Sequence, residues 1–223
     1  MKAVIFDMDG TLFQTGTVLE QSLEEAFAVL RERGDWQGAA PIEAYQKIMG
    51  VPLPAVWKAL LPRKSDDTKR EIDVYFLERL IANIIEGKGE LYPDVRRVFA
   101  ELSTQGYRIF IASNGLVRYL AAIVEYYGLG EWVTETFSIE QAATLDKGEL
   151  VRMIIEKYGV TQGAVVGDRL SDIRAAKANG LLAVGCRFDF AQEQELQQAD
   201  AVIDGLGELI NVLAEAESRE KTR

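Results

Sequence analysis

Two aspartates, Asp7 and Asp9, follow a short apolar stretch that contains β-branched residues. Residues 3–6 fit a buried strand whose two faces are both covered, and in an extended segment positions i and i+2 point to the same side. Two carboxylates held together at a strand end repel each other and lose hydration. A divalent cation is the simplest remedy. The pair therefore indicates a metal site with acid–base chemistry, or else an acidic turn with no chemistry.

Further polar residues stand where other predicted strands end. Ser113 and Asn114 follow one of these strands, and Asp168 follows another, with Asp172 four residues later. Lys147 lies in a loop before a predicted helix. In open α/β sheets, ligands bind beyond the carboxyl ends of the strands. Each group alone has an ordinary explanation as a turn or a solvated charge, but together they predict one site at one sheet edge.

Composition limits the functions that this chain can have. Its 223 residues are 48% hydrophobic and 27% charged, which is typical of a globular protein with one sizeable core and a second small unit. The net charge of −10 disfavours nucleic acids and anionic membranes as partners. No histidine is present, which excludes Ser-His-Asp catalysis and His-ligated zinc.

Cysteine usage and the start of the sequence bear on location. Cys186 is the only cysteine, so an intrachain disulfide cannot form, and we expect a small buried side chain in a reducing compartment. No apolar run reaches the roughly 18 residues of a membrane-spanning helix, and no signal peptide is evident. These features predict a cytoplasmic protein.

Strands alternate with helices in the second part of the chain, after Pro93. The predicted strands cover residues 107–112, 133–138, 164–166, 181–185 and 201–203. The predicted helices cover residues 95–102, 116–127, 148–158, 171–179 and 206–214, and we expect the charged end, 215–223, to fray. Such alternation predicts an α/β fold with a doubly wound, Rossmann-like parallel sheet.

The segment between the first strand and this region is helical. Apolar residues recur at helical spacing from Leu19 to Leu30, a short helix fits 41–49, prolines break up the stretch 52–62, and a longer helix fits 65–85 with Ser65 as its N-cap. We expect an inserted α-helical cap domain at 17–87 and a core domain formed by 1–16 and 88–223. Gly16 and Gly87-Lys88-Gly89 are the expected hinges. Three aromatic residues are expected in the cap core or the cap–core interface: Trp36, Tyr45 and Trp57.

The polar groups, in order and approximate spacing, resemble the four motifs of the haloacid dehalogenase superfamily. These are Asp7-Met8-Asp9-Gly10-Thr11-Leu12, Ser113-Asn114, Lys147, and Gly167-Asp168-x-x-x-Asp172. Within that superfamily the chain looks like the phosphatase branch related to phosphoglycolate phosphatase and β-phosphoglucomutase, and the resemblance covers nearly its whole length. One departure is that Gly148 follows Lys147, where many relatives have proline.

The resemblance implies an Mg²⁺-dependent phosphatase that acts on a small phosphorylated metabolite through an aspartyl-phosphate. In that mechanism Asp7 is the nucleophile, Asp9 is the general acid and base, and Lys147 neutralises charge. Asp7, the main-chain carbonyl of Asp9, and Asp168 hold the metal, while Asp172 contacts it through water or braces Lys147. The phosphoryl oxygens are bound by Gly10, Thr11, Ser113, Asn114 and Lys147.

Other functions stay open at this point. A mutase like β-phosphoglucomutase is the nearest alternative, although Thr11 resembles the phosphatase form. Asp9 disfavours a dehalogenase, whose relatives lack the second aspartate. A response-regulator receiver is about half this length and has no helical insert. A non-catalytic phospho-ligand-binding protein with the same fold is the alternative from another class. The substrate and the oligomeric state cannot be read from the sequence.

Overall fold

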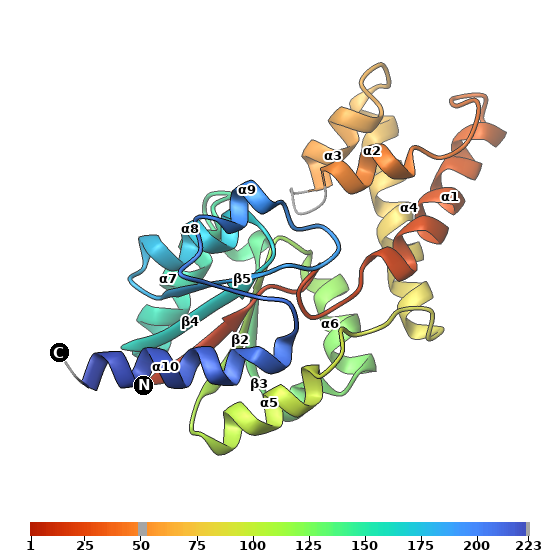
Figure 1. The fold of residues 1–223 in the computed structure, drawn as a ribbon. Coiled ribbons are helices and arrows are strands. Elements are labelled where there is room, and N and C mark those ends of the chain that lie inside the picture. Colours follow the sequence, from red (N-terminus) through yellow and green to blue (C-terminus); the bar gives the residue numbers. More distant parts are fainter. Residues whose placement is uncertain (49–52, 222–223) are drawn as a thin grey trace.

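The computed structural model describes residues 1–48 and 53–221. Its centre is a six-stranded parallel sheet with the strand order β3-β2-β1-β4-β5-β6 (Figure 1). The strands are β1 (Lys2–Phe6), β2 (Arg108–Ser113), β3 (Val133–Ser138), β4 (Gln162–Gly167), β5 (Leu182–Cys186) and β6 (Ala201–Ile203). The predicted α/β fold with a doubly wound, Rossmann-like sheet is therefore confirmed.

Apolar residues cover both faces of this sheet. In β1, Val4 and Phe6 belong to one buried cluster while Ala3 and Ile5 belong to a second, because successive side chains of a strand point to opposite faces. The first cluster includes side chains of α5 (Val95–Thr104) and α10 (Leu209–Lys221), and the second those of α7 (Lys147–Tyr158) and α8 (Leu170–Ala178). The continuous apolar strands thus result from helices on both sides.

The other helical elements are α1 (Gly16–Glu32), α2 (Ile42–Lys47), α3 (Leu53–Leu60), α4 (Asp66–Ile85), α6 (Val117–Tyr126) and α9 (Glu193–Leu196), with 3₁₀ turns at Leu129–Glu131, Ile139–Gln141 and Leu206–Glu208. Ser65 caps α4 as predicted, since its hydroxyl accepts from the Thr68 N–H at 3.1 Å. Cys186 is fully buried, also as predicted. Part of the expected short helix at 41–49, and Pro52, lie outside the described residues.

Three local predictions were wrong. The stretch thought to be broken by prolines contains α3, because Pro54 stands in the first turn, where the missing N–H costs no hydrogen bond. The charged end is not frayed through residue 221 but continues α10. There Glu217 accepts from Lys2 Nζ and from the Tyr107 hydroxyl, each at 2.6 Å. Lys147 is not in a loop but begins α7.

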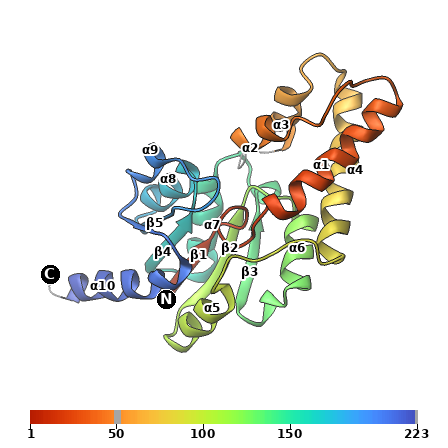
Figure 2. The same ribbon diagram turned by 45° about the vertical axis from the view of Figure 1, so that its right-hand side comes forward.

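Helices α1 to α4 stand together at one side of the sheet (Figures 1 and 2). They share apolar packing in which Trp57 and Tyr45 are buried against Phe76, with ring centroids 5.4 and 5.7 Å apart. Trp36 is partly buried and meets Phe27 edge-on at 4.8 Å. These aromatic residues therefore form part of a core, as we expected.

The two chain segments that join these helices to the sheet run side by side. Phe13 and Leu91 form an isolated antiparallel bridge, the Gln14 N–H donates to the Glu90 carbonyl at 2.9 Å, and the Tyr92 N–H donates to the Leu12 carbonyl at 2.9 Å. Gly87, at the end of α4, has a positive φ of 76°. The crossing is thus a short two-stranded ribbon.

Candidate active site

The predicted site residues meet at the carboxyl edge of the sheet, beside β1 and β4. Strand order reverses between these two strands, and such a switch point is where doubly wound sheets bind ligands. Phe6 is in register with Ile111 of β2 and Val166 of β4. The register consequently places Asp7 beside the ends of both neighbouring strands, next to the residues that lead into Ser113 and Asp168.

A tight turn follows Asp7. The carbonyl of Met8 accepts from the N–H groups of Leu12 and Phe13, both at 2.9 Å. Gly10 has a φ of 78°, a left-handed conformation that glycine adopts without penalty. A Cβ on Gly10 would lie 2.7 Å from Oδ2 of Asp168. The turn therefore needs glycine both for its backbone conformation and for the close approach of Asp168.

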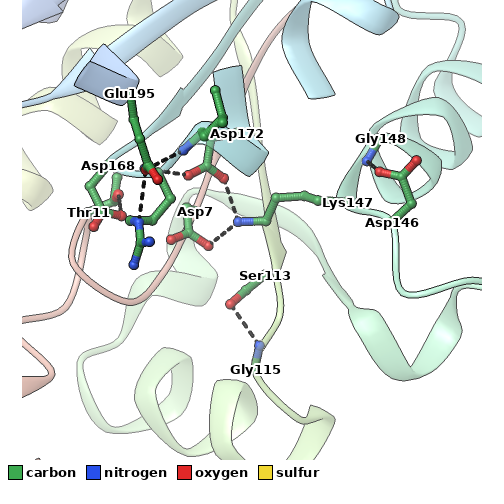
Figure 3. A network of polar contacts seen from close by, with 12 residues as sticks. Asp7, Thr11, Ser113, Gly115, Asp146, Lys147, Gly148, Asp168, Asp172 and Glu195 are labelled. Atoms are coloured by element: carbon green, nitrogen blue, oxygen red, sulfur yellow. Dashed lines mark hydrogen bonds and ion pairs between the residues drawn. The ribbon is translucent and has the colours of Figure 1, made fainter. Parts of the chain in front are cut away.

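Lys147 links two of the aspartates (Figure 3). Its ammonium lies 2.5 Å from Oδ1 of Asp7 and 2.5 Å from Oδ1 of Asp172, and all three side chains are buried. The start of α7 is fixed by Asp146, whose carboxylate accepts from the Gly148 N–H at 2.9 Å. Asp172 thus braces Lys147, one of the two roles expected for it.

Three buried carboxylates can hold a metal ion together. One oxygen from each of Asp7, Asp168 and Asp172 lies within 4.8 Å of the others. When all are ionised, these three negative charges and the single positive charge of Lys147 leave a formal charge of −3 + 1 = −2. Carboxylate oxygens are preferred ligands of Mg²⁺. The donor set, its charge and its burial therefore fit a hard divalent cation.

Burial governs the electrostatics of this group. Desolvation raises the pKa of Asp7 to about 7, against the opposing attraction of Lys147. Desolvation and the charges of Asp7 and Asp172 raise the pKa of Asp168 well above its usual range. Burial alone would lower the pKa of Lys147, but the Asp172 and Asp7 carboxylates outweigh it and raise that pKa. Lys147 is thus a stable cation beside Asp7, and the raised pKa values of Asp7 and Asp168 favour a proton on these two groups when no metal binds.

The carboxyl group of Asp9 does not belong to this cluster. Its Oδ1 accepts from the hydroxyl of Thr15 at 2.6 Å and from that of Tyr119 at 2.5 Å. Desolvation raises the pKa of Asp9, and the Thr15 and Tyr119 hydrogen bonds oppose that shift. Asp9 remains close enough to Asp7 for its charge to contribute to the raised pKa of Asp7. The two carboxyl groups are therefore neighbours with different partners, and the metal-capable cluster does not include the Asp9 carboxylate.

The expected phosphate-contacting residues border the same space. Thr11 is fully buried and donates to Oδ1 of Asp168 at 3.3 Å. Ser113, buried at the end of β2, accepts from the Gly115 N–H at 3.0 Å (Figure 3). Asn114 follows directly and is half-buried. Thr11 comes from the turn after β1, whereas Ser113 ends β2 and Asn114 follows it.

The pattern of motifs did not identify the partners of Asp9. Thr15 ends the turn after β1, whereas Tyr119 lies on α6, 110 positions from Asp9 in sequence. Glu195 was also missed; it accepts from the Leu170 N–H at 2.9 Å and from Arg169 Nε at 3.1 Å, beside Asp168. The motif spacing carries no signal for the Tyr119 and Glu195 contacts, since the packing of α6 and α9 on the sheet creates them. Thr15, in contrast, reaches Asp9 within the turn after β1.

Comparisons with known proteins identify the family of this chain. The family model of haloacid dehalogenase-like hydrolases matches residues 1–180. A phosphoglycolate phosphatase from Pectobacterium atrosepticum is 22% identical over 227 residues, covering 98% of this chain and 94% of that protein. The chain therefore belongs to the haloacid dehalogenase-like hydrolase family.

Solved structures share the fold over nearly the whole chain. The crystal structure of a predicted phosphoglycolate phosphatase from Haemophilus somnus has a TM-score of 0.85 and 19% identity, covering 96% of this chain and 98% of that one. CbbY from Rhodobacter sphaeroides, solved with xylulose-(1,5)bisphosphate, has a TM-score of 0.78 and 22% identity, covering 94% of this chain and 96% of that one.

Within residues 1–48 and 53–221, we find no helix with the length and apolar character to cross a membrane.

Proposed function

We propose that the protein is an Mg²⁺-dependent phosphatase that hydrolyses a small phosphorylated metabolite through an aspartyl-phosphate on Asp7. One observation carries the proposal. Asp7 lies in a buried cluster with Lys147 and two further carboxylates, while Asp9 stands beside it with separate hydroxyl partners. A nucleophile and a proton donor need such different environments, because one must be ionised while the other holds a proton.

The residues divide the reaction into two steps. Asp7 attacks the phosphorus atom, and the bond from phosphorus to the leaving oxygen breaks. Asp9 gives its proton to that oxygen and later accepts a proton from the water that hydrolyses the aspartyl-phosphate. Lys147 stays charged beside Asp7 and offsets the negative charge of the phosphoryl group. Ser113, Thr11 and the backbone around Gly10 are the proposed contacts for the phosphoryl oxygens.

Asp7, Asp168 and Asp172 would hold the metal, directly or through water, and the main-chain carbonyl of Asp9 would complete the protein's share of the ligands. When bound, Mg²⁺ would neutralise phosphoryl charge so that an anionic carboxylate can approach it. Gly167 permits part of this arrangement, since a Cβ at that position would collide with the Asp172 carboxyl group.

We propose that residues 17–87, which contain α1 to α4, act as a cap domain over a core of residues 1–16 and 88–223. The paired linkers around Phe13 and Leu91 are the only described chain segments that join the two groups. A bend there, together with a shift of α4 relative to α6, on which it packs, would move all four helices together. Closure would exclude water from Asp7 during attack. The substrate class follows the names of the relatives: a phosphorylated acid such as phosphoglycolate, or a sugar phosphate.

A turnover assay tests the function. Phosphate release would be measured on a panel that includes phosphoglycolate, a pentulose bisphosphate and hexose phosphates, with Mg²⁺, with EDTA and after Mg²⁺ is restored. We expect activity that EDTA abolishes and the metal recovers. Release of free phosphate, as opposed to an isomeric sugar phosphate, separates a phosphatase from a mutase. Full turnover in metal-free buffer would contradict the mechanism, and binding without turnover would favour the non-catalytic alternative.

Replacement of the nucleophile tests the intermediate. Asp7→Asn should abolish turnover and remove an acid-trappable acyl-phosphate that the wild type forms, because an amide is not a competent nucleophile. Asp204→Asn is a matched control, since Asp204 is an exposed partner of Arg187 and lies outside the proposed site. If Asp7→Asn keeps more than a small fraction of the wild-type kcat, Asp7 is not the nucleophile.

A further inference from the structure

One oxygen of Asp9 is held by two hydroxyl groups that come from different parts of the chain. Thr15 and Tyr119 both donate to Oδ1, at 2.6 and 2.5 Å, and each of these two residues is only 5% exposed. A carboxyl oxygen that accepts two such bonds has no lone pair left for a proton. Oδ2 is consequently the oxygen that can carry the proton.

The segment that carries Tyr119 is itself braced. The Gly115 carbonyl accepts from the hydroxyl of Ser138, at the end of β3, at 2.7 Å. The Val117 N–H donates to Oε2 of Glu140, in the 3₁₀ turn after β3, at 2.6 Å, so both segments hold the start of α6. A Cβ on Gly115 would lie 3.1 Å from Cδ1 of Tyr119, which shows how closely the ring packs on the turn after β2. Tyr119 therefore reaches Asp9 from a hydrogen-bonded segment whose Gly115 N–H also donates to Ser113.

We propose that Tyr119 is a positioning residue for Asp9: with Thr15 it fixes Oδ1 and leaves Oδ2 to deliver the proton to the leaving oxygen. This inference rests on the proposed phosphatase function. As the bond from phosphorus to the leaving oxygen breaks, the proton passes from Oδ2 to that oxygen and Asp9 becomes a carboxylate. The two hydroxyl bonds then become charge-assisted, which stabilises the new negative charge.

The leaving group decides how much this positioning matters. An alkyl phosphate expels a basic alkoxide that needs protonation in the transition state, whereas a nitrophenyl phosphate expels a stable phenolate. General acid catalysis contributes about 10²–10⁴-fold, so a misplaced acid should slow only the first substrate strongly. A residue that merely supports the fold would slow both substrates alike.

The experiment compares Tyr119→Phe with wild type in single-turnover phosphorylation of an alkyl phosphate and of nitrophenyl phosphate. We expect a loss of roughly tenfold or more on the alkyl ester, about twofold or less on the nitrophenyl ester, and little change in KM. Tyr107→Phe is the matched control, because Tyr107 donates a similar bond to Glu217 near the amino ends of the strands. It should leave both rates unchanged.

A second comparison uses the Asp9→Asn background. If Tyr119 acts through Asp9, adding Tyr119→Phe to Asp9→Asn should cause no further loss. Equal losses on the two esters, a further loss in the Asp9→Asn background, or no loss at all would overturn the inference while wild-type turnover still supports the function. An inactive wild type would instead contradict the proposed function itself.

Thr15 provides a test that does not depend on the stability of the tyrosine variant. Should Tyr119→Phe fail to fold, Thr15→Val removes the other bond to Oδ1 and keeps the side-chain shape. Its loss should again be larger on the alkyl ester, and Thr15→Ser, which retains a hydroxyl, should restore most of the rate. A Thr15→Val variant with wild-type rates on both esters would overturn the role assigned to the Oδ1 contacts.

Discussion

The ammonium of Lys147 lies 2.5 Å from Oδ1 of Asp7, although 140 positions separate the two residues in the chain. Lys147 begins α7 and Asp7 directly follows β1, so the contact exists only because α7 packs on the sheet. Asp172 accepts a second bond from the same ammonium at 2.5 Å. The buried triad of Lys147, Asp7 and Asp172 therefore contributes both to the stability of the fold and to the charge of the candidate site.

Removal of the Lys147 charge should destabilise the protein and inactivate it. Lys147→Met keeps roughly the length of the side chain but leaves Asp7 and Asp172 without their cation. An uncompensated buried charge costs about 3–5 kcal/mol. Denaturant unfolding in EDTA measures this loss. Lys177→Met is the control, because Lys177 pairs with Asp200 at 3.6 Å on the surface and should contribute no more than about 1 kcal/mol. Equal losses of unfolding free energy in the two variants would show that the buried triad stabilises the fold no more than a surface ion pair does.

The stability of the metal-free protein should depend on Asp7 in a defined direction. Burial raises the pKa of Asp7 from 3.8 to about 7, so the folded state binds this proton more tightly than the unfolded state. Its contribution is complete below pH 3.8 and is lost as the pH rises through about 7. In EDTA, the free energy of unfolding of wild type relative to Asp7→Asn should fall over that range, by at most about 4 kcal/mol.

Mg²⁺ should stabilise the protein more at high pH than at low pH, which is opposite to the pH dependence expected in EDTA. In the proposed site the ion would compete with protons for Asp7 and Asp168, whose pKa values burial raises, so it should bind best where these two groups are ionised. Thermal unfolding with and without Mg²⁺ should therefore show little difference near pH 4.5 and clear stabilisation near pH 8. Stabilisation that is independent of pH, or equal in Asp7→Asn, would exclude this cluster as the binding site.

Gly10 and Gly34 have almost the same backbone conformation, so alanine substitutions at these positions distinguish the cost of backbone strain from that of a steric clash. Gly10 and Gly34 have φ values of 78° and 75°, but a Cβ on Gly34 meets nothing within 4 Å, whereas one on Gly10 meets Asp168. Gly34→Ala should cost only the backbone strain, about 1 kcal/mol. Gly10→Ala should cost more and also weaken Mg²⁺ binding by displacing Asp168, as measured by calorimetric titration. Equal Mg²⁺ affinity in both variants would contradict the role given to Gly10.

Local patterns in the sequence were sufficient for most of the fold. Short apolar strands, helical periodicity and the Ser65 cap are set by neighbouring residues, and parallel strands necessarily bring their carboxyl ends to one edge. For that reason the residues after β1, β2 and β4 could be expected to meet. The continuation of α10 could not, because its last turns depend on Glu217, which is bound by residues from the starts of β1 and β2.

The different hydrogen-bond partners of Asp7 and Asp9 also could not be predicted from the local sequence. Extended spacing predicts that both carboxylates face one space, but the turn that closes on the Met8 carbonyl directs Asp9 to Tyr119 and Thr15. The predicted proximity holds, since the charge of Asp9 still affects the pKa of Asp7. The positions of α6 and α7 in the folded chain decide the distant partners, which are Tyr119 for Asp9 and Lys147 for Asp7.

The linker crossing offers a last test, directed at the proposed cap motion. A Cβ on Gly89 would lie 2.6 and 2.7 Å from ring carbons of Phe13, so Gly89→Ala inserts a methyl group between the paired linkers. Overpacking of this kind costs about 1–3 kcal/mol and would hinder a bend at the crossing. We expect kcat to fall several-fold on a metabolite-sized substrate and less on acetyl phosphate, because only the larger substrate depends on cap contacts for positioning.

A compensating substitution makes this hinge prediction specific. Phe13→Leu removes the ring atoms that the new methyl group would meet, so the Gly89→Ala, Phe13→Leu double variant should recover part of the lost kcat. Gly130→Ala is the control, because a Cβ there has open space around it. Small-angle scattering with Mg²⁺ and beryllium fluoride, a mimic of the aspartyl-phosphate, should show compaction in wild type that is weaker in Gly89→Ala. If scattering is unchanged by the fluoride complex and Gly89→Ala has wild-type kinetics, the four helices are a static lid and the crossing is not a hinge.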